Sequence, residues 1–166
     1  TFYYPTSIVY EKKVLTVHLL HILLKDLTKN LLEKLYNSLN KEINQHQLKD
    51  DNHRFIYRNQ GDFSLDQKIK TLVNYVLNPI ISRSILEYFF KKYLSYDLSK
   101  IFDKIYLSNA DLVHLHRNGH KIEPHFHSHI LLTLLDDLEL EKEFDLSVEV
   151  HESLFGVKPK RLAVPY

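Results

Sequence analysis

Histidines gather in one short segment of this chain. Six of its eleven histidines lie between residues 114 and 129, and three of them alternate in the stretch "HFHSH" as His125, His127 and His129. Residues at i and i+4 share one face of a helix, and residues at i, i+2 and i+4 share one face of a strand. In either conformation the imidazoles of His125 and His129 can therefore converge on one point. Two converging imidazoles are typical of a metal site or of a proton-transfer site.

The pair predicts a divalent-metal site that needs one more ligand. Catalytic zinc commonly takes three protein ligands and keeps one position for water. We expect His125 and His129 to be two of the three, and a carboxylate to be the third. Such a ligand set suits zinc first, and cobalt, iron or nickel as well. The chain contains no cysteine, so thiolate sites and disulfides are excluded.

The alternative to a metal site is that histidines in such a cluster pack against other side chains or face solvent. We interpret the histidines that stand alone or lie on expected helices in this way. They are His18, His21, His46, His53, His114, His116 and His151.

The elements that must position the pair fall into two groups. Residues 11 to 103 are typical of helices, because apolar residues recur at spacings of three and four from Val14 to Leu39. Ser64 followed by Gln67 is a capping box, and Pro79 suits the first turn of another helix.

From residue 105 onward, strand-like and helical stretches alternate. We expect short strands near residues 2–9, 105–107, 120–124 and 161–165. We expect helices from Ser108 to Arg117, ending at Gly119, and from Asp137 to Phe155, ending at Gly156. This alternation predicts a parallel sheet with helices packed on it. Chemistry in such folds lies beyond the carboxyl ends of strands, which is where the histidine pair stands.

Composition excludes some partners. The formal net charge is +1, which provides no electrostatic reason to expect nucleic acid. The most apolar run, Val14 to Leu24, is too short and too polar to span a bilayer. The first residues show no signal-peptide pattern. The compartment, cytoplasm or cell envelope, and the oligomeric state stay open.

Three segments carry a resemblance to a known family. The stretch "LSNADLVHLHRNGHKIEPHFHSHILL" resembles the second motif of the polysaccharide deacetylases, a family of carbohydrate esterases. There a Gly-His-x-Ile turn precedes His-x-x-x-His; here these are residues 119–122 and the pair His125 and His129. "SLFGVKPKRLAVPY" resembles the third motif, and "TFYYPTSIV" resembles the strand that follows the first motif. The segments occur in the family's order and cover residues 1–10 and about 105–166.

The resemblance implies an α/β fold, namely a partial, distorted β/α barrel. Residues 1–10 and 104–166 would form it, and residues 11–103 would be a large helical insertion of the sort found in members linked to bacterial surface polysaccharides. The implied activity is metal-dependent hydrolysis of acetyl groups, N- or O-linked, on a polysaccharide or oligosaccharide.

The resemblance also implies roles for single residues. His125 and His129 would bind the metal, with His120 and His127 behind them; for His127 we favour a structural or surface role. Pro165 and Tyr166 would contact the sugar, and the backbone N–H of Tyr166 would donate to the oxyanion.

Other parts of the family pattern differ or are missing. Glu123, Pro124, Phe126 and Ala163 stand where the family commonly has other residues. The family's Asp-Asp pair, which supplies the base and the third ligand, lies upstream of the strand that this sequence opens with, and its acid histidine lies beyond Tyr166. Asp50-Asp51 and Asp136-Asp137 do not follow strands, and we interpret them as solvated acids. We therefore expect the 166 residues alone to show little or no deacetylase activity.

A non-catalytic function is the competing hypothesis. The helical residues, with the aromatic stretch "LEYFFKKYLSY", could form an interaction or carbohydrate-binding module, or the chain could be an inactive piece of a deacetylase. An aromatic stripe at helical spacing is usually core. A binding module would be indifferent to chelators, whereas a deacetylase needs its metal.

Overall fold

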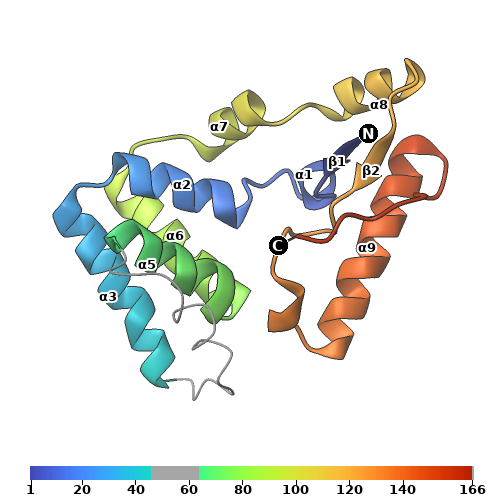
Figure 1. Ribbon diagram of the computed structural model, residues 1–166. Coiled ribbons are helices and arrows are strands. Elements are labelled where there is room, and N and C mark those ends of the chain that lie inside the picture. The colour runs from blue at the N-terminus through green and yellow to red at the C-terminus, as the bar shows by residue number, and fades with distance from the viewer. Residues whose placement is uncertain (46–63, 166) are drawn as a thin grey trace. The chain divides into compact units, whose positions relative to one another are not determined.

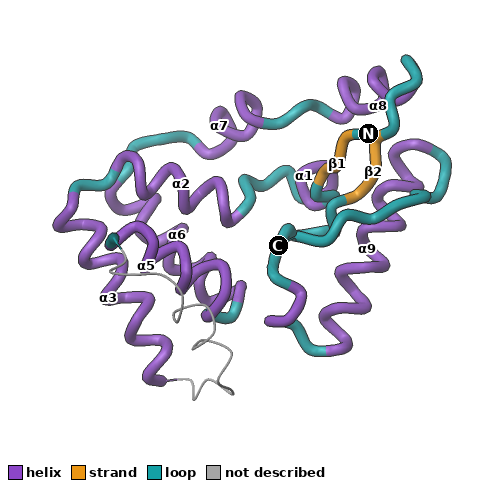
Figure 2. Tube along the Cα trace, in the orientation of Figure 1, coloured by secondary structure: helices purple, strands orange, loops and turns teal. Residues whose placement is uncertain are grey.

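The computed structural model describes residues 1–45 and 64–165, and these are mostly helical (Figures 1 and 2). About two thirds of them lie in helices, and strands are limited to β1 (Phe2–Tyr4) and β2 (Ile122–Pro124) in the described part of the chain. The two strands pair in parallel, with Phe2 opposite Ile122 and Tyr4 opposite Pro124. The expected α/β fold, a partial β/α barrel, is therefore wrong, because two strands of three residues do not form a barrel sheet.

The chain divides into two compact units. Unit 1 combines Thr1–Leu15 with Tyr96–Tyr166, and unit 2 is the continuous stretch Thr16–Ser95. The sequence pattern had placed the two boundaries of the helical block after residues 10 and 103. Helix α7 (Leu98–Ile105) thus belongs to unit 1 and not to the helical block.

Unit 2 is a helical bundle with a leucine core. Its helices are α2 (Thr16–Asp26), α3 (Lys29–Gln45), α5 (Leu65–Thr71), the π-helical turn η1 (Leu72–Val76) and α6 (Pro79–Tyr93). Helix α2 packs on α6, and α3 packs on both α5 and α6. Six leucines are fully buried between them: Leu19, Leu20, Leu23, Leu35, Leu39 and Leu86.

The capping signals expected in unit 2 are confirmed. The Ser64 hydroxyl accepts from the N–H of Gln67, and the Gln67 side chain accepts from the N–H of Ser64. Pro79 is the first residue of α6, behind the N-cap Asn78. The aromatic stretch of α6 divides by face, since Phe89 and Phe90 are buried and Tyr88 is exposed. The two phenylalanines therefore serve the core.

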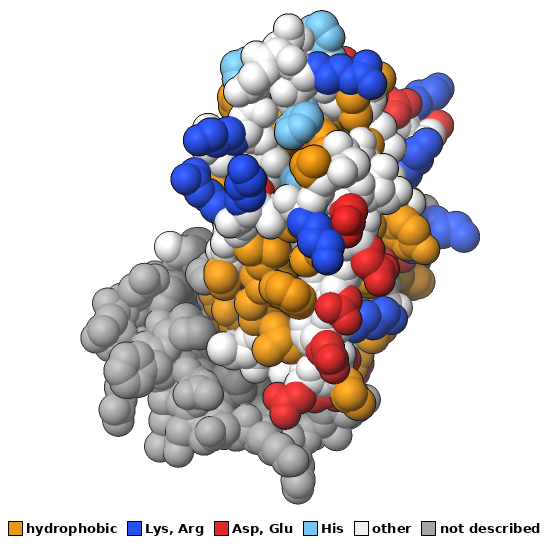
Figure 3. All heavy atoms as spheres, turned by 90° about the vertical axis from the view of Figure 1, so that its right-hand side faces the viewer, with side chains coloured by type: hydrophobic (Ala, Val, Ile, Leu, Met, Phe, Trp, Pro, Cys, Tyr) orange, Lys and Arg blue, Asp and Glu red, His pale blue; other side chains and the backbone are white. Residues whose placement is uncertain are grey.

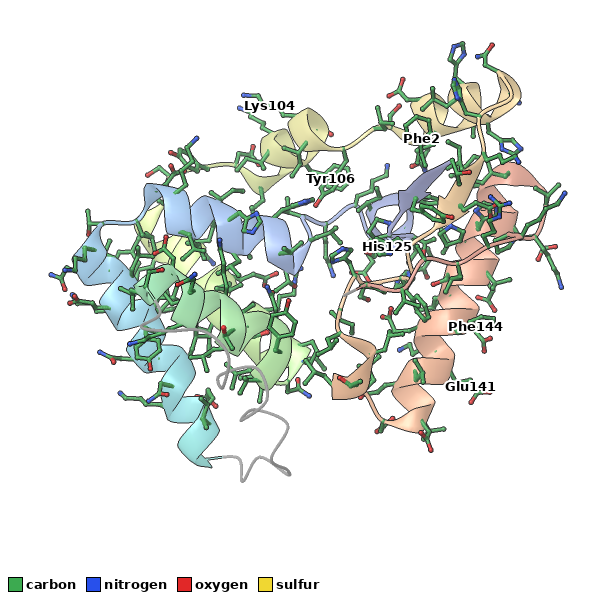
Figure 4. The ribbon with its side chains drawn as sticks, in the orientation of Figure 1. Phe2, Lys104, Tyr106, His125, Glu141 and Phe144 are labelled. Atoms are coloured by element: carbon green, nitrogen blue, oxygen red, sulfur yellow. The ribbon has the colours of Figure 1, made fainter. Side chains whose placement is uncertain are left out.

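Unit 1 combines the strand pair with helices. These are α1 (Ser7–Tyr10), α7, α8 (Asn109–Arg117), the 3-10 turn η2 (Leu132–Leu134) and α9 (Asp137–Phe155). Both α8 and α9 contact β2, and α1 contacts α9. The outer face of α9 mixes apolar and acidic side chains, including Leu138, Phe144 and Glu141, which point into solvent (Figures 3 and 4).

Three expected strands are shorter than predicted or do not form. The strand near residues 2–9 ends at Tyr4, because Pro5 interrupts it and α1 begins at Ser7. Residues 105–107 do not form a strand: Ile105 is the last residue of α7, and the two residues after it leave the helix. The helix begins at the N-cap Asp97, so the three letters "IYL" taken alone gave the wrong prediction. Residues 161–165 make one backbone bond to β2, from the N–H of Ala163 to the carbonyl of Pro124 at 3.0 Å. Prolines 124 and 165 have no N–H to donate, so a longer ladder cannot form there.

The helix boundaries of unit 1 agree better with the sequence. Ser108 and Asp111 form a capping box at the start of α8. Helix α9 spans Asp137–Phe155 as expected and ends at Gly156, which has a φ of 72°. Asp136 is the N-cap of α9, and both it and Asp137 are exposed, as solvated acids should be. Asp50 and Asp51 lie outside the described residues.

The described helices contain no segment long and apolar enough to cross a membrane.

Gly156→Ala should destabilise unit 1 through the backbone alone. A Cβ at this position would meet no atom within 4 Å, so the cost is that of a left-handed conformation, about 1–2 kcal/mol. Urea unfolding followed by circular dichroism measures it. The matched control is Ser153→Ala, an exposed position in the same helix, where we expect a change within about 0.5 kcal/mol. Equal stability of the two variants would contradict the assigned role of Gly156.

Candidate functional site

The histidine segment begins where β2 ends. The backbone N–H of His125 donates to the carbonyl of Tyr4 at 2.8 Å, which continues the strand pairing by one residue. Thr6 N–H then donates to the carbonyl of Phe126 at 3.0 Å. The first residues of the chain therefore run beside the histidine segment and hold its backbone (Figure 4).

The two histidines of the predicted pair lie together. Their ring centroids are 4.8 Å apart, and the ring planes are nearly perpendicular at 86°. Two imidazoles that bind one tetrahedral zinc at about 2.0–2.1 Å place their ring centres about 5 Å apart. Both side chains are half-buried. The distance between the ring centres of His125 and His129 lies near the value for a shared zinc, and their T-shaped packing is also that of an ordinary aromatic contact.

The ring of His125 is oriented by a backbone carbonyl. Its Nδ1 lies 3.0 Å from the carbonyl oxygen of Ala163. A carbonyl only accepts hydrogen bonds, so Nδ1 carries the proton, and the Nε2 of the neutral ring keeps its lone pair. Metal-binding histidines are commonly fixed in this way by a partner on the other ring nitrogen.

The loop between the pair has unusual backbone angles. Phe126 and His129 have φ values of 56° and 55°, in the left-handed region that side chains disfavour by about 1–2 kcal/mol per residue. Such angles persist only where the surroundings hold them. The contacts that hold this loop are therefore part of the site.

One of these contacts comes from Glu143 on α9. Its Oε2 accepts from the backbone N–H of His127 at 3.2 Å and from that of Ser128 at 2.9 Å. The carboxylate is 8% exposed. Glu143 was not among the site residues predicted from the sequence, although a signal exists: Glu143, Ser147 and His151 repeat every four residues along α9. Polar residues at that spacing, with apolar Val150 between them, mark a helix face that meets polar partners.

A second buried carboxylate holds the other side of the site. The Oε2 of Glu123 accepts from the backbone N–H groups of Lys160 and Arg161 at 3.1 and 3.3 Å. Together with the bond between Ala163 and Pro124, it ties residues 160–163 to β2. This fixes the carbonyl that orients His125. Glu123, a departure from the family pattern, thus has a structural role in this chain.

His127 anchors the loop through its side chain. Its Nδ1 lies 2.9 Å from the Thr6 hydroxyl, and its Nε2 lies 3.5 Å from a carboxylate oxygen of Glu11. Partial burial raises the pKa of Glu11, but the ammonium of Lys13 and the ring of His127 outweigh it, so the pKa is lowered overall. His127 is almost fully buried, so of the structural and surface roles that we expected, a surface role is excluded.

The remaining site candidates lie elsewhere or outside the description. His120 is exposed, and its ring meets the edge of Phe2 at 5.7 Å. Pro165 is fully buried. Tyr166, expected to supply an oxyanion donor, lies outside the described residues, as do His46 and His53. His18 is half-buried in α2, where burial first and His21 second lower its pKa.

The third ligand is not in place within residues 1–45 and 64–165. No three histidine or acidic side chains of these residues come together in a group able to hold a metal ion. Comparisons with protein-family models, with curated proteins and with solved structures find no match for this chain. The resemblance to polysaccharide deacetylases therefore rests on the motif residues themselves.

A buried polar cluster lies behind the strand pair. The Nδ1 of His151 is 3.4 Å from the hydroxyl of Tyr4, and the rings of His151 and His116 both contact Phe155. Burial lowers the pKa of His151; Glu123 opposes this and His116 adds to it. Burial, with a smaller effect of Glu123, raises the pKa of Tyr4. Both side chains are therefore neutral inside the folded unit at neutral pH.

The lowered pKa of His151 predicts that unit 1 loses stability in mild acid. Above the ordinary value of 6.5 the ring is neutral in both states. As the pH falls below 6.5, the unfolded chain binds a proton that the folded chain resists, so the free energy of unfolding decreases. NMR titration of the His151 ring should give a midpoint below 6.5, and His151→Gln should flatten the pH dependence of urea unfolding between about pH 7 and 5. A midpoint at or above 6.5 would contradict this.

Proposed function

We propose that unit 1 binds a divalent metal ion through His125 and His129, and that the metal serves the hydrolysis of acetyl groups on an N- or O-acetylated polysaccharide. The observation that carries the proposal is the pair itself. Its rings are 4.8 Å apart, and a carbonyl bond to Nδ1 leaves the Nε2 of His125 available.

The arrangement of the three family-like segments also supports the proposal. Residues 2–4 pair with residues 122–124, and Ala163 bonds to Pro124. Segments that are more than a hundred residues apart in sequence thus meet at the histidine pair, and they are the segments that resemble the family's motifs. A His-x-x-x-His pattern that occurs by chance on a surface helix would not need these distant segments to meet beside it.

The donor set fits zinc, and also cobalt, iron or nickel. When bound, such an ion lowers the pKa of a water ligand and polarises the acetyl carbonyl. The chain's own contribution is to orient: Ala163 fixes the ring of His125, and His127 with Thr6 fixes the loop. The backbone N–H of Tyr166, which lies outside the described residues, is proposed as the oxyanion donor. Pro165 is fully buried and is therefore not proposed to contact the sugar. Two carboxylates are proposed to complete the site, one as third metal ligand and the other as general base.

Metal binding is the first test. We expect cobalt(II), added to the whole chain, to give a visible absorption band and a measurable Kd. Removing a direct ligand in His125→Ala or His129→Ala should weaken binding by more than about tenfold, since even partners of the ligands contribute 10–100-fold. His120→Ala, at an exposed histidine of the same segment, is the matched control and should bind as the wild type does. Equal binding by all four proteins would count against the pair.

Acetate release is the second test. With zinc or cobalt and acetylated chitooligosaccharide or acetylated xylan, we expect little or no turnover, because the described residues supply two of three ligands and a missing base alone costs about 10²–10⁴-fold. Any residual turnover should disappear with a chelator and in His125→Ala.

Two outcomes would change the proposal. Robust turnover that is lost in His125→Ala would show that the chain supplies its own carboxylate, and Asp→Asn variants would locate it, at Asp50, Asp51, Asp136 and Asp137. No turnover, with polysaccharide binding that a chelator does not affect, would instead favour the non-catalytic carbohydrate-binding module.

A further inference from the structure

We infer that Glu143 is a positioning residue for the metal pair: its buried carboxylate holds the loop between His125 and His129 in the conformation that brings the two rings together. The inference rests on the proposed metal site. It goes beyond that proposal because it assigns the geometry of the site to a side chain on a different helix.

The hydrogen bonds of the loop show what Glu143 adds. The peptide group that joins Phe126 to His127 accepts from Thr6 at its carbonyl and donates to Glu143 at its N–H. The next peptide group, from His127 to Ser128, accepts from Ser7 and also donates to Glu143. Both peptide groups are thus held at both ends, by the first residues of the chain on one side and by one carboxylate on the other.

This double support explains how the left-handed residues persist. Phe126 and His129 stand at the two ends of the supported stretch, each with a positive φ. If the N–H groups lost their acceptor, the two peptide planes could rotate, and the positive φ values could relax. Rotation of those planes would turn the ring of His129 away from that of His125, because the peptides that turn are the ones between them.

The carboxylate itself is well fixed. Glu143 is buried on α9, and the Ser147 hydroxyl donates to its backbone carbonyl at 2.6 Å. The helix is closed at its start by the Asp136–Glu139 capping box and at its end by Gly156. A buried acceptor that takes two backbone N–H groups, on a helix closed at both ends, is suited to hold a loop in one conformation.

The test compares cobalt(II) binding by the whole chain in variants of one helix. Glu143→Ala removes the acceptor, and Glu143→Gln keeps one uncharged acceptor oxygen in the same place. Ser147→Ala is the control, because it removes a buried hydrogen bond of α9 without touching the loop. We expect Glu143→Ala to weaken cobalt binding at least about tenfold and to change the visible spectrum. Glu143→Gln should recover part of the affinity, and Ser147→Ala should match the wild type.

The outcomes separate this inference from the proposed function. If the wild type binds no cobalt, or if His125→Ala binds as well as the wild type, the proposed metal site fails. If His125→Ala loses cobalt but both Glu143 variants bind like the wild type, the metal site stands and the role of Glu143 is refuted. A loss in Ser147→Ala as large as in Glu143→Ala would also refute it, because the effect would then be general loosening of α9. Should Glu143→Ala fail to fold, Glu143→Gln decides, with a loss of affinity supporting the inference and wild-type affinity overturning it.

Discussion

Unit 1 depends on one constraint: its strand pair is too short to provide hydrogen-bond acceptors for all the backbone N–H groups buried around it. Two strands of three residues supply few ladder bonds, yet the segments beside them are partly buried and their N–H groups need acceptors. Two glutamates meet this need. Glu123 accepts from the consecutive N–H groups of Lys160 and Arg161, and Glu143 accepts from those of His127 and Ser128. They act where a larger sheet would have provided another strand.

This constraint explains why the ends of helices could be predicted from the sequence better than the strands could. Helix ends are encoded locally: Ser64 with Gln67, Ser108 with Asp111, and Gly156 each determine a boundary through residues within one turn. Strands are not encoded in this way. "RLAVPY" has the composition of a strand, but prolines leave it with a single bond to β2.

In the site, too, local spacing could be read from the sequence, whereas contacts between distant residues could not. The spacing of His125 and His129 predicted that they share one face of a helix or of a strand. Their rings do lie together, but residues 125–129 form a loop with positive φ at Phe126 and His129. The groups that hold them come from far away in the sequence: Ala163 is 38 residues from His125, and Glu143 lies 15 and 16 residues from the amides that it binds. The four-residue repeat of Glu143, Ser147 and His151 marks a polar face of α9, but a single sequence does not show which backbone groups that face meets. The glutamates were visible only as members of a helix and of a strand, and no pattern indicated which backbone groups they would meet.

The parallel pairing of β1 with β2 also has a consequence for the order in which the chain can fold. Unit 2 is continuous in sequence, whereas unit 1 needs residues 2–4 and residues 122–124 at the same time. During synthesis at roughly 5–20 residues per second, unit 2 is complete before β2 exists, and β1 then waits roughly a few seconds more for its partner. In that interval the aromatic residues Phe2, Tyr3 and Tyr4 have no strand to pair with. Because unit 2 lies between β1 and β2 in the sequence, the two strands can pair only late in synthesis. The histidine pair can assemble only after the strands have paired.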